Sequence, residues 1–410
     1  MPLAAAIVKY AALHREIFGE YEYSLLPQPS EANLQRIAKP FLQFLVDEGL
    51  REIEAVVLIM QTAQGYGFLE TVPAYYALSW LTPKLLECFL QAALPVGNAL
   101  DDQHGFQVNV IMLLRNGFLH LWDRMVEVEQ LGGQIQYGVH VHAIRRRGIG
   151  TGTSSMSSAV EISLRREQPQ EAGPNPVKAA DADGREPEEF FSLYPSPAEV
   201  KDKEKSLGDF GETIACDYLF VAAPFDVVLP LLGDGATPDE TEYINALRPM
   251  TLVASLFTST SVMERPIESM VEGSKLTGEG RLYSARHTRR VNDPSLPPPA
   301  DGREPYVGHQ LYNGRMAPAD AKAAQATMVK DLAAYGYQDV QVGKYCAFNT
   351  YLPHVDVEGV CVHKYPWKLL ANQGQNHTVW IGSSACYESV LDVVNYNNLL
   401  LDREHIKLVD

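Results

Sequence analysis

The sequence has no long hydrophobic run and few basic residues. It carries 34 Lys and Arg against 51 Asp and Glu in 410 residues, a net charge of −17. A nucleic-acid backbone would be repelled by this charge, so nucleic-acid binding is disfavoured. No stretch reaches the roughly 20 apolar residues of a membrane-spanning helix, and the start has no basic segment before a small-residue cleavage site. We therefore expect no membrane span and no signal peptide, and a cytoplasmic location by default.

Cysteine is also sparse, and the familiar catalytic motifs are missing. The five cysteines are scattered, without a CxxC pair or the Cys/His spacing of a zinc site. This favours reduced core thiols over a disulfide framework or a metal centre. The sequence contains no G-x-S-x-G, HExxH or Walker motif. These absences remove the simplest hydrolase, metalloprotease and nucleotide-hydrolase interpretations.

Three weaker patterns favour ordinary structure over chemistry. The segment GIGTGT (148–153) has Thr153 where a dinucleotide-binding fingerprint needs its third glycine, so it predicts a turn. His140 and His142 stand two apart on an expected strand; a metal is one interpretation, and an exposed sheet edge explains them as well. The group 101–104, with two aspartates and a histidine, has acid–base chemistry but is better interpreted as a solvated loop.

The composition, 46% hydrophobic and 21% charged, is that of a globular protein with one large core or two to three domains. Residues 1–29 predict an N-terminal helix that PQPS (27–30) interrupts. Ser30 is suited to cap the next helix. Apolar residues from Leu34 to Leu50 recur at three- and four-residue steps and predict one buried helix. Residues 30–105 are expected to form several short packed helices.

Beyond residue 105 the pattern changes to strands. The expected elements are a helix over 119–130 ended by Gly132 and Gly133, strands over 134–137, 139–144, 158–167 and 213–224, and a helix from Phe225. Residues 168–209 are rich in Pro, Glu, Asp and Lys, and we expect a disordered insertion there. Residues 245–360 predict further strands and a helix over 318–337.

The C-terminal stretch is the most specific part. A short strand (379–381) runs into the small residues Gly382-Ser383-Ser384-Ala385, and a helix is expected next. Small residues let a ligand approach the backbone, and a helix N-terminus attracts electron-rich groups. An ordinary strand-to-helix connection explains the pattern equally well on local grounds.

Three segments together carry a resemblance: GGQIQYGVHVHAIRRR, CDYLFVAAPFDVVLPLL and VWIGSSACYESVLDVVNYNNLLL. In this order they resemble the later two-thirds of FAD-dependent oxidoreductases of the flavin amine oxidase superfamily. The resemblance implies that FAD lies along a defined set of residues. The Val141 backbone would lie beside the adenine, and the chain would pass the cofactor at Ala223 and Pro224. Contacts to the pyrophosphate, ribityl chain and flavin O2 edge would come from Gly382, Ser383, Ser389 and Val390.

A second similarity narrows the branch. GYGFLETVPAYYALSWLTP (65–83) and YNNLLL (396–401) are similar to the fungal β-cyclopiazonate dehydrogenase group and to flavin-dependent polyenoic fatty-acid isomerases. This similarity implies a substrate pocket lined by Tyr66, Tyr75 and Tyr76, with Trp367 at the flavin face. Core packing is the alternative for each of these residues. No residue is predicted as a catalytic acid or base.

The sequence departs from that family because the N-terminal dinucleotide-binding βαβ unit, with its G-x-G-x-x-G turn, has no counterpart. We expect an α/β fold with a discontinuous, incomplete Rossmann-like FAD-binding domain (106–240 and 361–410). A substrate domain with a mixed sheet and helices (30–105 and 245–360) would complete it. The implied function is hydride transfer from a small apolar or aromatic metabolite to flavin N5, by analogy in secondary metabolism. A fatty-acid double-bond isomerase and a non-catalytic remnant are the alternatives.

Overall fold

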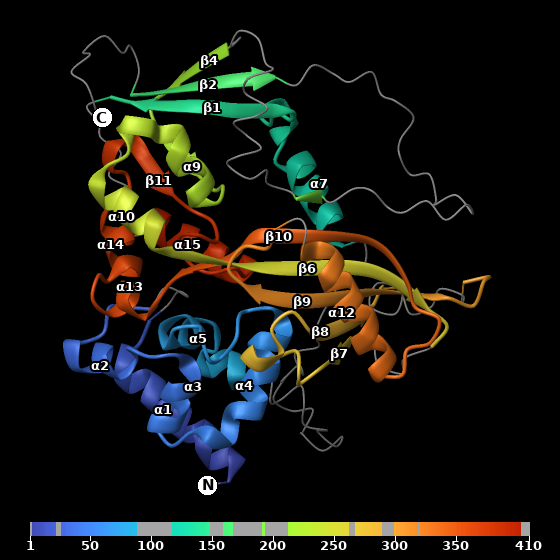
Figure 1. Cartoon of the computed structure of the whole chain (residues 1–410). Helices are drawn as coiled ribbons and strands as arrows, with labels where there is room; N and C mark the ends of the chain where they lie inside the picture. Colours follow the sequence, from blue (N-terminus) through green and yellow to red (C-terminus); the bar gives the residue numbers. More distant parts are fainter. Residues whose placement is uncertain are drawn as a thin grey trace, which may run out of the picture.

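The chain forms a group of short helices, a six-stranded sheet and a three-stranded sheet, as seen in a computed structural model (Figure 1). The helical group lies at the N-terminal end, the large sheet in the middle and the small sheet at the far end. The structure describes residues 2–21, 26–87, 117–147, 159–166, 191–192, 212–261, 267–288, 299–317 and 320–402.

The helical group confirms the short helices expected over 30–105, as far as residue 87. It comprises α1 (Leu3–Phe18), α2 (Glu31–Arg36), α3 (Phe41–Asp47), α4 (Glu54–Met60) and α5 (Ala74–Trp80). Ser30 caps α2, since its side chain accepts a hydrogen bond from the N–H of Asn33. The single helix expected from Leu34 to Leu50 is wrong. Pro40 divides it, because a proline has no N–H to donate within a helix and is suited to the residue just before one.

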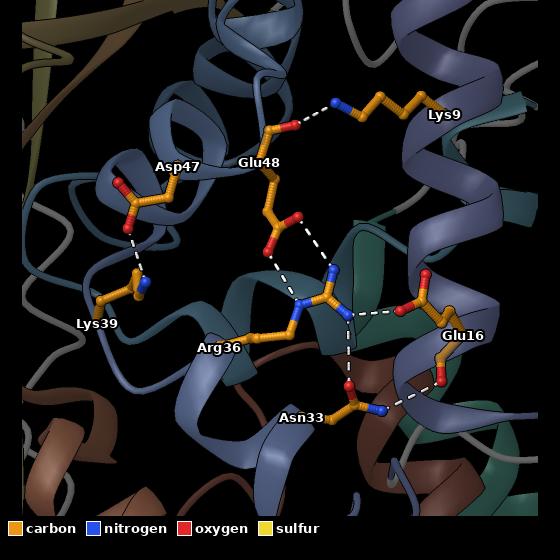
Figure 2. A network of polar contacts seen from close by, with 7 residues as sticks. All are labelled: Lys9, Glu16, Asn33, Arg36, Lys39, Asp47 and Glu48. Carbon is orange, nitrogen blue, oxygen red and sulfur yellow. Dashed lines mark hydrogen bonds and ion pairs between the residues drawn. The ribbon is translucent and has the colours of Figure 1, made fainter.

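A polar network on the surface ties these helices together (Figure 2). The guanidinium of Arg36, on α2, donates to the carboxylate of Glu48 after α3 and to Glu16 on α1. Asn33 donates to the Glu16 carbonyl oxygen at 3.2 Å. The side chains are partly exposed, so the network fixes geometry more than it stabilises the fold.

The large sheet has the strand order β3-β10-β6-β9-β8-β7. Its strands are β3 (Phe191–Ser192), β6 (Leu247–Ser259), β7 (Ile267–Ser269), β8 (Leu282–His287), β9 (Glu304–Asn313) and β10 (Gln341–Val355). All neighbours are antiparallel except β3 and β10. Helix α12 (Asp320–Ala334) covers one face, where Met328 and Leu332 join a core with Phe257. The other face joins the main core, which contains the helical group.

The small sheet is an antiparallel meander of β1 (Val139–Arg146), β2 (Val160–Arg166) and β4 (Glu212–Cys216). Helix α7 (Gly117–Val128) precedes it. The strand expected over 134–137 is wrong; a 3-10 turn over Leu131–Gly133 is followed there by irregular backbone. The strand expected over 213–224 is also wrong as one element. The chain bends at Asp217, so that β5 (Leu219–Val221) leaves the meander and pairs in parallel with β11 (Thr378–Trp380).

Helices α9 (Phe225–Leu232) and α10 (Pro238–Ala246) follow β5 in the chain. Helices α13 (Val357–Cys361) and α14 (Tyr365–Ala371) precede β11, and α15 (Val390–Asp402) follows it. The buried guanidinium of Arg146, on β1, pairs with Glu240 of α10 at 2.6 Å. It also donates to the Thr378 hydroxyl of β11 at 3.1 Å and to the Gly235 carbonyl. One side chain therefore joins the meander, α10 and the strand pair.

Several sequence expectations fall outside the described residues. These are the turn over 148–153, the group 101–104, Cys88 and most of the insertion 168–209, of which only Phe191–Ser192 are described, as β3. Within the described ranges, no helix is long and apolar enough to cross a membrane, and no cluster of His, Cys, Asp or Glu could hold a metal. The four described cysteines are free thiols.

Candidate cofactor and substrate site

The C-terminal bend lies where the two parallel strands end. The N–H of Ile381 donates to the Val221 carbonyl at 2.9 Å, and Gly382 follows with φ = +84°. A side chain at Gly382 would place its Cβ 3.0 Å from the Ala222 carbonyl oxygen. Only glycine fits both the conformation and this contact, so the bend has no side chain at this point. The crevice beyond the carboxyl ends of adjacent parallel strands is the usual ligand position in open α/β sheets.

The structure brings several of the predicted cofactor residues to this bend. Ala223 is exposed and Pro224 half-buried just beyond β5, while Gly382 and Ser383 are half-buried just beyond β11. Val141 is 41% exposed on β1, a strand that packs against α9. The chain enters α9 directly after Pro224.

The remaining two predicted cofactor residues, Ser389 and Val390, stand at the start of α15. This helix begins at Val390, seven residues after Ser383, and not at the bend itself. The Ser389 hydroxyl accepts a hydrogen bond from the N–H of Asp392 at 3.0 Å and donates to the Asp392 carboxyl group. The first turn of α15 is therefore capped by its own residues, and Val390 is 48% exposed beside it.

A buried carboxyl group lies in the loop between the bend and α15. Glu388 accepts a hydrogen bond from the Leu352 N–H at 2.9 Å, and Leu352 has the left-handed φ of 44°. Burial raises the pKa of Glu388 to about 7, although the Leu352 and Ser383 hydrogen bonds act in the opposite direction. The side chain can hold or release a proton near neutral pH. Glu388 was not predicted from the sequence, because an acidic residue just before a helix has no distinctive local pattern.

An aromatic cluster joins the helical group to the same loop. The ring of Tyr66 lies 4.5 Å from Trp80 and 5.3 Å from Tyr387, centroid to centroid. Gln61 donates to the Tyr387 hydroxyl at 3.0 Å and to the Tyr66 carbonyl. Tyr66 is half-buried, so its ring has both packed and open sides. Tyr387 and Trp80 were not singled out from the sequence.

The other predicted pocket residues lie deeper. Tyr75 packs edge-on against Trp367 at 5.2 Å, and the Trp367 indole N–H donates to the Leu26 carbonyl at 2.8 Å. The Tyr76 hydroxyl accepts a hydrogen bond from the Val355 N–H at 3.1 Å. All three side chains are at least nine-tenths buried. The Tyr76 ring stacks against the ring of Tyr387, with centroids 6.4 Å apart.

A separate cavity of about 320 Å³ lies between α10 and α14. Tyr243, Tyr365, Lys368 and Trp380 contribute to its wall. None of the residues predicted from the sequence lines it. We therefore place the candidate site at the Gly382 bend and the aromatic cluster, and not in this cavity.

Comparison with known proteins identifies the fold. No family model matches the sequence, and no curated protein matches it significantly. Among solved structures, a CLA-producing fatty acid isomerase from P. acnes is similar with a TM-score of 0.62 at 17% identity, covering 98% of this chain and 74% of that one. A triple mutant of putrescine oxidase with redesigned cofactor binding gives a TM-score of 0.52 at 12% identity, with the same coverage. The chain has a mixed α/β fold that resembles the FAD-dependent amine oxidase fold. At these identities the likeness establishes the fold alone.

The residues present fit the flavin end of FAD better than its pyrophosphate. The Gly382 bend offers bare backbone, and the exposed Ala223 and half-buried Ser383 flank it. No glycine-rich phosphate turn is found among the described residues. Backbone N–H groups at the bend are thus the available donors for electron-rich groups of a bound cofactor.

Proposed function

We propose that the chain is an FAD-dependent oxidoreductase whose flavin lies beside the Gly382 bend. The observation that carries this is the bare backbone of Gly382 at the carboxyl ends of two parallel strands, where a Cβ would lie 3.0 Å from the Ala222 carbonyl oxygen. The fold, shared with FAD-dependent enzymes, supports the same position.

In this proposal the cofactor contacts are those predicted from the sequence. Gly382, Ser383, Ser389 and Val390 together contact the ribityl chain, the flavin O2 edge and, less closely, the pyrophosphate. The chain passes the cofactor at Ala223 and Pro224. The Val141 backbone lies beside the adenine. FAD, when bound, supplies the capacity to accept a hydride at N5; the protein contributes orientation and exclusion of water.

The proposed substrate is a small apolar or aromatic metabolite. Tyr66, with Trp80 and Tyr387, forms the wall nearest the bend, and rings at these separations offer apolar contact surface. Tyr75, Tyr76 and Trp367 support that wall from the core. Glu388 holds a proton at the boundary between the bend and the sheet, through its contacts with Ser383 and Leu352.

Flavin retention tests the proposal. The purified chain is incubated with FAD, and excess cofactor is removed. The absorbance of bound flavin at about 450 nm, which is a property of the cofactor itself, is then measured. We expect the wild type to retain FAD and Gly382→Val to lose it. Gly336→Val is the matched control, because Gly336 has the same left-handed conformation (φ = +87°) but no other atom within 4 Å of the position that a Cβ would take. Absence of flavin from the wild type, or equal retention by Gly382→Val, contradicts the proposal.

Dioxygen uptake then separates the reaction types. An oxidase consumes oxygen in step with substrate. A double-bond isomerase, which returns the hydride to its substrate, consumes none, and its product has the same mass as the substrate. A dehydrogenase that uses another electron acceptor also consumes no oxygen, but its product is lighter by two hydrogens. All three outcomes require bound flavin, whereas a remnant without catalytic function would turn over no substrate in either assay.

A further inference from the structure

A half-buried arginine stands on the face of the large sheet that looks toward the helical group. Arg286 lies on β8, and no carboxylate among the described residues pairs with it. Its Nε atom is buried without a hydrogen-bond partner, whereas the side chain as a whole is half-buried. A buried donor of a permanent cation is costly to leave unsatisfied. Such an arginine is suited to an anion that binds from outside.

Two tyrosine hydroxyls converge beside Gly65, and the charge of this arginine acts on both and on the neighbouring Tyr66. A Cβ at Gly65, whose φ is +95°, would lie 2.9 Å from the Tyr283 hydroxyl and 3.0 Å from that of Tyr351. These two oxygens therefore converge on one point above the Gly65 backbone. None of the three hydroxyls has a hydrogen-bond partner among the described groups, so all three remain available as donors.

His309 completes the environment without adding a charge. Burial, and secondarily the charge of Arg286, lowers the pKa of His309 to about 3. Ser284 fixes the ring through a 3.1 Å hydrogen bond with Nδ1. The imidazole is thus neutral at physiological pH. It does not repel Arg286, and Arg286 carries the positive charge that an anion would meet here.

The same tyrosines connect this group to the Gly382 bend. The carboxylate of Glu388 acts on the same tyrosines as Arg286: it raises the pKa values of Tyr66 and Tyr351, and the arginine lowers them. Glu388 in turn bonds to Ser383, next to Gly382. Glu388 therefore links the tyrosines that respond to Arg286 with the Gly382 bend.

We propose that Arg286, assisted by the hydroxyls of Tyr66, Tyr283 and Tyr351, binds a carboxylate group of the substrate. The substrate is therefore an organic acid with an apolar body, held by its anion at the sheet while its other end extends past Tyr66 toward the bend. This orientation rests on the proposed function, whereas anion binding at Arg286 does not require FAD.

Binding of matched amphiphiles to the purified chain tests the inference. Octanoate, octan-1-ol and octylamine share a chain length and differ in the charge of the head group. We expect calorimetry without FAD to show octanoate binding at least about tenfold more tightly than the alcohol, because a charge-assisted contact is worth about ten- to a hundredfold in affinity. Octylamine should bind more weakly than the alcohol.

Variants locate the anion site. Arg286→Gln should weaken octanoate binding by about ten- to a hundredfold and leave octan-1-ol binding unchanged. Arg286→Lys should retain part of the preference for the acid, because the charge remains but the forked geometry is lost. Arg145→Gln, at an exposed position on β1, is the charge-matched control and should bind octanoate like the wild type. Tyr351→Phe, which removes one hydroxyl, gives a milder loss if Arg286→Gln proves to be unfolded.

Three results would overturn the inference: no octanoate binding by the wild type, equal affinity for the acid and the alcohol, or full retention of the preference in Arg286→Gln. Flavin absorbance of the same samples is read separately. A chain that binds octanoate through Arg286 but no FAD contradicts only the proposed function, and one that binds FAD but shows no acid preference contradicts only the anion site.

Discussion

The Glu388 carboxyl group accepts a hydrogen bond from the backbone N–H of Leu352, 2.9 Å away, and so joins the loop before α15 to the end of β10. Leu352 adopts a left-handed backbone conformation that a branched side chain rarely takes. This bond and the buried position of Glu388 together define a protonation site between the sheet and the bend.

Glu388 should make stability depend on pH. Its folded pKa of about 7 exceeds the ordinary 4.5, so between these values the folded chain holds a proton that the unfolded chain has released. The stability that the protonated Glu388 contributes to the folded chain is present below pH 4.5 and is lost as the pH rises to 7. Relative to the wild type, Glu388→Gln should gain about 3 kcal/mol in unfolding free energy across this interval. Urea unfolding of both proteins between pH 4 and 8 measures the difference.

The comparison of two proteins removes the effect of other titrating groups. Buried His309 changes stability in the opposite sense, since its folded pKa is lowered, but it does so equally in both proteins. Parallel pH profiles for wild type and Glu388→Gln would show that Glu388 titrates normally.

Arg146 and Arg36 should differ sharply in their effect on stability. The Arg146 side chain is fully buried, and its removal leaves Glu240 buried without its partner. Burial alone raises the pKa of Glu240, but the Arg146 hydrogen bonds and charge, with the Thr237 bonds, together lower it. We expect Arg146→Gln to cost about 3–5 kcal/mol. Arg36→Gln, in the partly exposed network of Figure 2, should cost about 1 kcal/mol or less.

Urea midpoints measure both costs. The double change Arg146→Met with Glu240→Leu provides the control, because removing both charges leaves neither group buried without its partner and should recover much of the loss. Equal effects of Arg146→Gln and Arg36→Gln would refute the distinction between the buried and the exposed pair.

Gly382→Ala should destabilise the fold more than Gly336→Ala. Both glycines have left-handed backbones, so each replacement costs about 1 kcal/mol from conformation alone. Only at Gly382 does the new methyl group lie 3.0 Å from a backbone oxygen, which should add about another 1 kcal/mol. Thermal or urea unfolding of the pair isolates the contact, and equal losses would mean that the Ala222 carbonyl moves freely.

The sequence predicted elements whose signals are local. Ser30 caps a helix because its hydroxyl reaches an N–H three residues away, and α9 begins at Phe225 directly after Pro224. The helix predicted over 318–337 is confirmed as α12, because its signal also lies within the segment itself. Pro40 also acts locally, yet the regular apolar spacing around it masked the break. The division of 213–224 is different in kind, because the partners of β4 and β5 lie in separate sheets.

The candidate site was only partly predictable for a similar reason. Gly382 stands out because small residues follow an apolar strand. Glu388 gains its properties from Leu352, 36 positions away, and Tyr387 from Gln61, 326 positions away. Arg286 is noticeable only because no carboxylate of the described residues pairs with it, which the chain order does not reveal. The chemistry of these residues arises from tertiary contacts.

The threefold attachment of Arg146 has a consequence for how the molecule opens. Its guanidinium holds a meander strand, the Thr378 end of β11 and the turn before α10 in one place. Separating any of these exposes the same buried cation, so they should unfold together. Hydrogen exchange should therefore show similar protection for the amides of β1 and β11, although 232 positions separate Arg146 from Thr378 along the chain.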